Sequence, residues 1–229
     1  MAGPTVVPHV AGAILFDLAV GDSRARPTRA MGYRACLSAA SGPVEEGNVG
    51  AGTGATVGKL LGIRHAMKGG IGSASVRVGG VVVGALVAVN ALGDVRDPET
   101  GHLLAGTRNA PDGRGLFDTA TALARGAQLQ GFAAPQHTTI GVVATTGQLS
   151  KPEATKVAQL GMLGFARALS PPHTAVDGDA LFCLSVGDVP ADLTTVGLAA
   201  ADAVAQAIAR AIKAATSLPG FPAWKDLSA

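Results

Sequence analysis

The residue with the greatest chemical potential in this sequence is Thr138. It follows His137 and a proline-containing loop, and it opens a run of β-branched and small apolar residues that extends to Thr145. Such a junction indicates a loop that enters a buried strand. Thr138 has two interpretations there. It is either a strand-start residue with high β propensity, or a nucleophile that becomes the first residue of a new chain when the peptide bond before it is cut. In the second case its own α-amine is the base for its hydroxyl.

Other polar groups occupy comparable junctions. Lys59 ends a glycine-rich run at 47–58, where glycines allow the backbone to approach a reaction centre closely. Asn90 follows a valine-rich stretch, and it is either a turn residue or an amide donor to an oxyanion. Asp177 and Asp179 flank a glycine just before another apolar stretch, so they either form a turn or act as orienting carboxylates.

A glycine-rich run that ends in lysine also invites comparison with nucleotide-binding loops. The phosphate-binding loop requires a different glycine spacing and a Ser or Thr after its lysine, whereas Leu60 follows Lys59. Residues 50–55 fit a loose dinucleotide fingerprint, but no strand pattern precedes them. In addition, no acidic residue between Glu46 and Asp94 could hold a ribose. The sequence therefore predicts no cofactor.

Composition and charge exclude several classes of function. The net charge of +2 and the 15% of charged residues are too weak and scattered for a nucleic-acid surface. Asp177 and Asp179 lack further ligands at metal-binding spacing. Cys36 and Cys183 match no CxxC or Cys/His ligand spacing, and their small apolar neighbours indicate buried free thiols in a reducing compartment. The apolar N-terminal stretch has neither the charged start of a signal peptide nor the length of a membrane span. We therefore expect a soluble, cytoplasmic protein without a membrane partner.

The elements that must position these groups follow from hydrophobic periodicity. With 48% hydrophobic but only 3% aromatic residues, the core must consist of Val, Ala, Leu and Ile, in one large domain or two small ones. A capping box of Ser150 and Glu153 marks one helix start. The segment 93–135 is interpreted as a surface connection that tolerates a chain break, and 219–229 as a loose tail. Buried strands are expected at 13–16, 138–145 and 180–186, and a strand pair or one bent strand at 76–90. The expected helices lie at 30–40, 119–130, 150–168 and 195–216.

Taken together, these motifs resemble the L-aminopeptidase/D-esterase and β-aminopeptidase family, which includes the nylon-oligomer hydrolases. The matching segments cover essentially the whole chain in the right order, and the ordered set is specific although each piece alone is weak. They are LFDL at 15–18 with GD at 21–22, GNVGAGTGA at 47–55 continuing to Lys59, GGIGSAS at 69–75, VAVNA at 87–91, TTI at 138–140, PHT at 172–174 and DGDALF at 177–182.

The resemblance implies a fold and a maturation step. The implied fold is an α/β sandwich, with two β-sheets between helical layers, formed by one domain over residues 1–229. The precursor would cut itself between His137 and Thr138 into subunits 1–137 and 138–229, which stay associated and usually form a homo-oligomer.

The resemblance also assigns roles. Thr138 is the nucleophile, Lys59 and Asn90 line the site, and Asp177 and Asp179 hold the new amine and the threonine hydroxyl. The implied activity is hydrolysis of short peptides, amides or amide oligomers through an acyl-enzyme on Thr138. Two alternatives stay open: acyl transfer to an amine, as in the similarly built ornithine acetyltransferases, and a non-enzymatic role as a shortened folding or binding unit.

Two features depart from the family pattern. His137 stands before the cut where the family usually has asparagine. The chain also begins at a point where family members are already well advanced, so the implied sandwich is N-terminally shortened and has open sheet edges.

Overall fold

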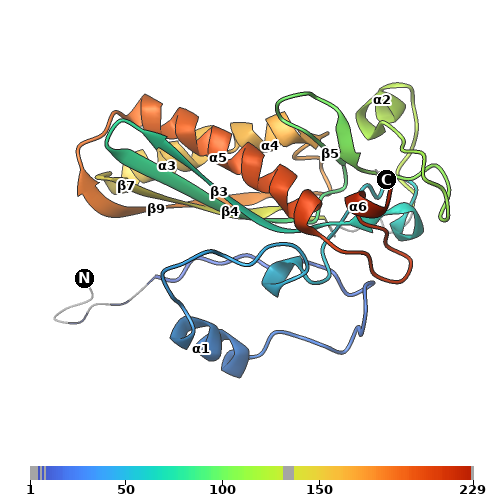
Figure 1. The fold of residues 1–229 in the computed structure, drawn as a ribbon, viewed down its shortest axis with the longest axis horizontal. Helices are drawn as coiled ribbons and strands as arrows, with labels where there is room; N and C mark the ends of the chain where they lie inside the picture. The colour runs from blue at the N-terminus through green and yellow to red at the C-terminus, as the bar shows by residue number, and fades with distance from the viewer. Residues whose placement is uncertain (1–4, 6, 8, 131–136, 228–229) are drawn as a thin grey trace.

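A mixed four-stranded β-sheet lies at the centre of the computed structural model, which describes residues 5, 7, 9–130 and 137–227 (Figure 1). β3, β4 and β7 are antiparallel neighbours, whereas β9 runs parallel to β7. The strands, in their order across the sheet, are β3 (Gly70–Val78), β4 (Val81–Val89), β7 (Ile140–Gly147) and β9 (Ala180–Val189).

The hairpin of β3 and β4 follows directly from the sequence. Gly79 and Gly80 form its turn, and Gly79 adopts a φ of 56°, a left-handed conformation that glycine reaches without strain. Along most of β4, buried residues alternate with half-buried ones, because successive side chains of a strand point to opposite faces. The predicted strand pair at 76–90 is confirmed, and it begins earlier, at Gly70.

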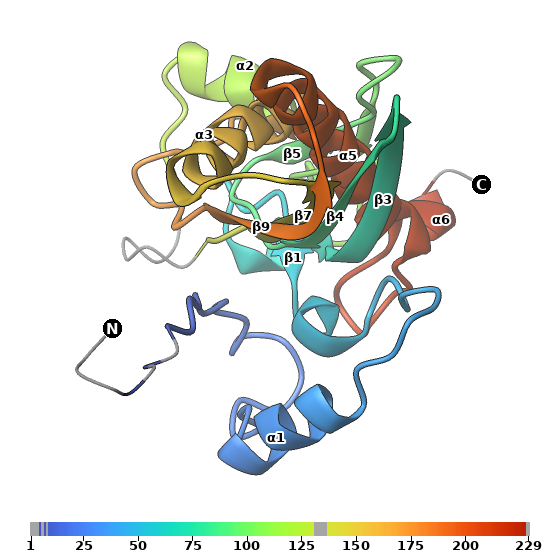
Figure 2. The same cartoon turned by 90° about the vertical axis from the view of Figure 1, so that its left-hand side faces the viewer.

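Three helices cover one face of this sheet: α3 (Lys151–Gly161), α4 (Leu163–Ala168) and α5 (Leu193–Ala214) (Figures 1 and 2). The predicted capping box starts α3, where the Ser150 amide and hydroxyl both bind the Glu153 carboxylate. α5 is long and apolar enough to cross a membrane, but 72% of its most apolar window is buried inside the protein, as in a core helix. The expected helices at 150–168 and 195–216 and the α/β class are therefore confirmed.

The contact between α5 and β3 brings two backbones together. A Cβ atom added to Gly72 would lie 2.2 Å from the carbonyl oxygen of Ala207 and 2.4 Å from the nitrogen of Ala211. Small residues on both elements allow this approach, so a core poor in aromatic side chains still packs densely.

Two smaller sheets lie beside the central one. The first pairs β1 (Thr56–Val57) with β2 (Met67–Lys68). The second has the order β6-β5-β8, formed by β6 (Leu103–Ala105), β5 (Asp94–Arg96) and β8 (Leu169–Ser170). Short helical segments complete the elements: η1 (Gly50–Gly52), η2 (Ile63–His65), α2 (Thr119–Ala124) and α6 (Trp224–Leu227).

The expectation of a surface connection at 93–135 is wrong for its first part. Asp94 is completely buried because its carboxylate accepts hydrogen bonds from the Thr107 amide (3.0 Å), the Thr119 amide (2.6 Å) and the Thr119 hydroxyl (2.7 Å). The polar sequence indicated exposure to solvent, but these protein hydrogen bonds take the place of hydrogen bonds to water. The expected helix at 119–130 ends already at Ala124. Residues 131–136 lie outside the described residues.

The N-terminal segment, residues 9–46, lies on the side of the sheet opposite to the three helices (Figure 2). Its only helix in the described residues, α1 (Arg29–Leu37), matches the expected one at 30–40, but it buries none of its residues. The expected buried strand at 13–16 is wrong: Ile14 is 87% exposed and no strand forms. A β-strand requires a hydrogen-bonded neighbour, and this stretch has no ladder partner in the described structure.

Three further expectations are corrected. Cys36 is exposed rather than buried because α1 buries none of its residues in the described structure, and Cys183 is half-buried. β9 is an edge strand and only partly covered, so it is not the buried strand that its apolar sequence indicated. The C-terminal tail is not loose as far as Leu227, since α6 forms there, Ala223 is buried and the Pro222 carbonyl accepts the Lys68 amide at 2.9 Å.

Candidate active site

Sheet topology brings the predicted site residues to one end of the central sheet. β4 ends where its antiparallel neighbour β7 begins, so Asn90 meets Thr138, and the Thr138 amide donates to the Asn90 carbonyl at 3.0 Å. β9 runs parallel to β7, so the loop with Asp177 and Asp179 enters beside Thr138 as well. The Asp179 carboxylate accepts the Thr139 amide at 2.7 Å.

Lys59 reaches the same point from the glycine-rich loop. Its Nζ donates to the side-chain Oδ1 of Asn90 at 2.8 Å and to the Asn90 carbonyl at 3.1 Å, the same carbonyl that binds the Thr138 amide. Both side chains are buried, with 5% and 0% exposure. The amide of Thr56 also donates to Asn90 Oδ1, at 3.1 Å, and the Asn90 Nδ2 donates to the Phe16 carbonyl at 3.1 Å. Asn90 therefore connects four segments of the chain.

Burial dominates the electrostatics of the site. It lowers the pKa of Lys59 to about 7, although the carboxylates of Asp177 and Asp17 act in the opposite direction. Burial and the neighbouring Lys59 also lower the pKa of His137 to about 4. Burial raises the pKa of Asp179 despite the hydrogen bond from Thr139. Near neutral pH the site thus contains a neutral imidazole and a lysine that readily releases its proton.

The two aspartates hold the loop rather than the nucleophile in this uncut chain. Asp177 accepts the Leu92 amide at 3.1 Å and the Thr174 amide at 3.1 Å, and it also accepts the Thr174 hydroxyl. Asp179 pairs with His173, whose Nδ1 lies 2.9 Å from its carboxylate. No hydrogen bond joins either carboxylate to Thr138 within the described part of the chain, so their assignment to the amine and hydroxyl stays a prediction.

A second buried lysine, Lys68, was not singled out from the sequence as a site residue. It is completely buried, and its Nζ donates to the carbonyls of Gly52 (2.7 Å), Ala55 (2.8 Å) and Gly69 (3.1 Å). Burial lowers its pKa to about 8. Lys68 fixes the glycine-rich loop that carries Lys59. The sequence signal that could have indicated this role is the position of Lys68 beside Gly69, within a stretch rich in glycine.

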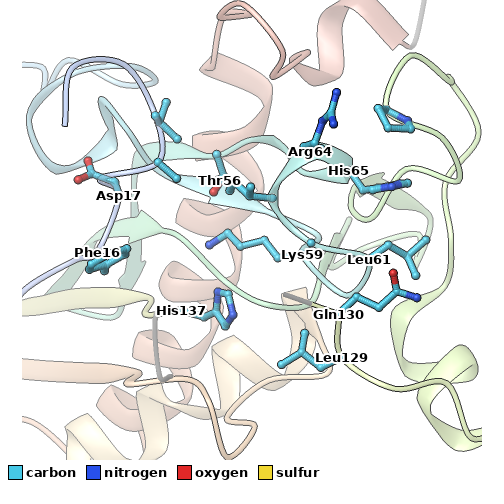
Figure 3. Close-up of a pocket in the computed structure, with 15 residues that line it drawn as sticks. Phe16, Asp17, Thr56, Lys59, Leu61, Arg64, His65, Leu129, Gln130 and His137 are labelled. Carbon is cyan, nitrogen blue, oxygen red and sulfur yellow. The ribbon is translucent and has the colours of Figure 1, made fainter. Parts of the chain in front are cut away.

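The site opens into a cavity of about 460 Å³ (Figure 3). Lys59 and His137 lie at its centre, with Phe16 and Asp17 on one side and Leu61 on the other. The remaining walls are mostly apolar, and Arg64, His65 and Gln130 add polar groups. Phe16 was expected in a buried strand, and Asp17 was not among the predicted site residues. Within the described residues, no group of three or more His, Cys, Asp or Glu side chains could hold a metal ion.

Comparisons with known proteins show the family of this chain. The sequence profile described as "Peptidase family S58" matches residues 2–224. An uncharacterized aminopeptidase of Mycobacterium leprae is 40% identical over 243 residues, which is 96% of this chain and 65% of that protein. A 6-aminohexanoate-oligomer endohydrolase of a Kocuria species is 30% identical over 189 residues, which is 81% of this chain and 52% of the relative.

Solved structures give the same result for the fold. The L-aminopeptidase D-Ala-esterase/amidase from Ochrobactrum anthropi, described as a variant of the Ntn hydrolase fold, superposes with a TM-score of 0.57 at 25% identity, covering 85% of this chain and 52% of that chain. A Burkholderia β-aminopeptidase superposes with a TM-score of 0.53 at 25% identity, covering 81% and 51%. The chain thus spans from about half to about two thirds of the length of these proteins. The family resemblance read from the motifs is confirmed: the chain belongs to peptidase family S58.

Proposed function

We propose that this protein is a precursor that cuts itself between His137 and Thr138 and then hydrolyses peptide or amide bonds through an acyl-enzyme on Thr138. One observation carries the proposal. Lys59 and the Thr138 amide donate to the same carbonyl oxygen, that of Asn90, while the Thr138 hydroxyl lies 2.6 Å from the carbonyl oxygen of the bond to be cut. The nucleophile contacts the scissile carbonyl, and the Asn90 carbonyl links its amide to the candidate base in a largely buried site.

After the cut, Thr138 acquires its own base. An α-amine has a pKa of about 8, so a sizeable fraction is neutral near pH 7 and accepts the hydroxyl proton. When Lys59 is protonated, its charge lowers the pKa of that amine further. Before the cut, the Thr138 nitrogen donates to the Asn90 carbonyl, so the freed amine stays within reach of this carbonyl. Asp177 and Asp179 are the nearby carboxylates that would orient the amine.

The substrate reaction then repeats the first one on an external amide. The Thr138 hydroxyl attacks the substrate carbonyl, the amine product leaves with a proton, and water releases the acyl group from the ester. Asn90 is the proposed donor to the oxyanion. One N–H of its Nδ2 is directed to the Phe16 carbonyl, and the other is the donor that this role would use.

The cavity beside Lys59 supports an amide substrate with a largely apolar body. Apolar walls near Phe16 and Leu61 suit a hydrocarbon chain, and Asp17 offers a carboxylate for a free amino end. The relatives are named aminopeptidase and 6-aminohexanoate-oligomer endohydrolase, and both names describe enzymes that hydrolyse amide bonds.

Mass spectrometry of the purified full-length protein tests the proposal. We expect two fragments that separate at Thr138, whereas the Thr138→Ala variant stays intact and Thr138→Ser still cuts. Thr139→Val is the matched control, because the neighbouring hydroxyl is buried without a hydrogen-bond partner in the described structure. A wild-type chain that stays whole after prolonged incubation at pH 8 contradicts the proposal.

A further inference from the structure

We infer that the backbone amide of Gly178 is the oxyanion donor for the self-cleavage step. The inference rests on the proposed function, and it assigns a group that neither the sequence motifs nor the proposed mechanism uses. Its basis is the position of one N–H group relative to the bond between His137 and Thr138.

The carbonyl oxygen of His137 accepts two hydrogen bonds. The Gly178 amide donates to it at 2.7 Å, and the Thr138 hydroxyl donates at 2.6 Å. The first distance is that of a short, well-formed N–H···O bond. When the hydroxyl oxygen attacks the carbonyl carbon, it gives up its own bond to that oxygen, and the Gly178 amide is the donor that stays. A donor at such a distance, fixed before the reaction, stabilises the developing negative charge without reorganisation.

Sheet structure holds this amide in place. A parallel bridge joins His137 to Asp177 and continues the pairing of β7 with β9, and the next bond of the same ladder is donated by the Ala180 amide to the Thr139 carbonyl at 3.0 Å. Asp177 closes a turn onto the Thr174 carbonyl at 3.0 Å. The amide of Gly178 is therefore held by a strand ladder on one side and a turn on the other.

The glycine at this position has a steric reason. A Cβ atom added to Gly178 would lie 2.9 Å from the Thr138 Oγ1, closer than side-chain carbons approach other atoms. Gly178 does not have a positive φ, so its backbone conformation does not require glycine. Glycine is required here because a side chain would occupy the space of the nucleophile. The same residue thus supplies the donor and leaves room for the attacking oxygen.

Asn90 does not compete for this role in the uncut chain. Its Nδ2 donates to the Phe16 carbonyl and its Oδ1 faces Lys59 Nζ at 2.8 Å, whereas the His137 carbonyl accepts from the Gly178 amide and the Thr138 hydroxyl. The two oxyanion donors are therefore divided between the steps: the Gly178 amide for self-cleavage and the Asn90 side chain for external substrates.

Self-cleavage proceeds as an N-to-O acyl shift followed by hydrolysis of the resulting ester. The Thr138 oxygen forms a bond to the His137 carbonyl carbon, and the carbon–nitrogen bond of the peptide breaks. The hydroxyl proton passes, with Lys59 as the nearby base, to the departing nitrogen, which becomes the α-amine of Thr138. Water then adds to the ester, which releases the His137 carboxylate and restores the Thr138 hydroxyl.

Replacement of one backbone amide by an ester tests the inference on the full-length protein. Glycolic acid at position 178 replaces the N–H by an ester oxygen and adds no side chain, and we expect self-cleavage to slow by about 10²- to 10³-fold, the usual effect of losing one oxyanion donor. Lactic acid at position 180 is the matched control, because it removes the neighbouring ladder bond to Thr139 without touching the scissile carbonyl. We expect the control to cut within a few-fold of the wild-type rate.

The outcomes separate this inference from the proposed function. If the wild type cuts and both esters cut equally fast, Gly178 is not the donor although the enzyme assignment stands. If the wild type never cuts, the proposed function fails as well.

NMR on the uncleavable Thr138→Ala precursor gives a second measurement, independent of how well the esters fold. We expect a through-hydrogen-bond coupling between the Gly178 nitrogen and the His137 carbonyl carbon. Its absence, with rapid exchange of the Gly178 amide proton, overturns the inference.

Discussion

The central body, residues 47–227 as far as they are described, and the N-terminal segment at 9–46 contain similar kinds of residues but have different structures. In the body, apolar stretches form a sheet that three helices cover, and most of their side chains are buried. In the N-terminal segment, α1 buries nothing, and apolar residues such as Ile14 and Tyr33 are exposed. Apolar sequence alone therefore does not make a strand or a core helix. A neighbour that supplies hydrogen bonds and a complementary face is also required.

The two regions nevertheless meet at the candidate site. The Phe16 carbonyl accepts a hydrogen bond from Asn90, and Phe16 and Asp17 line the cavity. The candidate site residues and most of the buried side chains lie in the body, whereas the N-terminal segment supplies one wall of the cavity and an acceptor for Asn90. Substitutions in the two regions test this division.

The largest effect is expected for Lys59→Met. This change keeps the length of the side chain but removes the base, so self-cleavage should slow by about 10³-fold, in the range for a general base. Time courses by mass spectrometry measure the rate. The exposed Lys156 on α3 provides the control, Lys156→Met, which should cut normally. A Lys59→Met chain that cuts at the wild-type rate removes this lysine from the mechanism.

The next largest effect concerns packing in the body. In Gly72→Ala the new methyl group would meet the backbone of α5 at 2.2 Å, so β3 and α5 must move apart. We expect a loss of about 3 kcal/mol, the upper range for overpacking, and a melting temperature lower by roughly 6–12 °C for a domain of this size. Thermal unfolding followed by circular dichroism measures the change. An unchanged melting temperature would mean that β3 and α5 are less closely packed than described.

The pH dependence of self-cleavage should report the titration of Lys59. Because its pKa in the folded protein is about 7, the neutral amine that accepts a proton becomes populated as the pH rises from 6 to 8. The rate should therefore rise about tenfold per pH unit below pH 7 and level off above it. A rate that is flat from pH 6 to 9 contradicts the assignment.

The lowered pKa of Lys59 also makes the stability of the fold depend on pH. The folded value of about 7 lies below the ordinary value of 10.5, so burying Lys59 destabilises the fold most below pH 7, where the buried group is charged. This cost diminishes as the pH rises from 7 toward 10.5. Lys59→Met should accordingly raise the melting temperature at pH 6 more than at pH 9, which thermal scans at both values would detect.

A smaller effect is expected for Asp17→Asn, in the N-terminal segment. The Asp17 carboxylate raises the pKa of Lys59, so its removal should shift the pH profile of self-cleavage to lower pH. The shift should be smaller than the roughly one unit or more that a contacting opposite charge produces. An unshifted profile means that the segment does not lie against the site in solution.

The candidate site is more readable from the sequence than the periphery of the fold is. Thr138, Asn90 and Asp177 lie at strand ends, and strand pairing brings such ends together, so a correct strand order is enough to assemble them. The partner of a strand is not readable from its own residues, which is why 13–16 was misassigned. The burial of Asp94 escaped detection because it depends on amides and a hydroxyl supplied by residues 107 and 119. The role proposed for Gly178 was not readable from the sequence, because it depends on the direction of a backbone N–H and not on a side chain.

The smallest effect is expected for Gly32→Ala in α1. Nothing lies within 4 Å of the position that the new Cβ would occupy, in contrast to Gly72. Alanine favours the helix locally by about 1 kcal/mol, yet α1 buries no residue against the body. The added helicity should therefore leave the main unfolding transition within about 1 °C of the wild type. A clear rise in that transition would show that α1 unfolds together with the sheet, and the two regions would then form one cooperative unit rather than a stable body with a loosely attached segment.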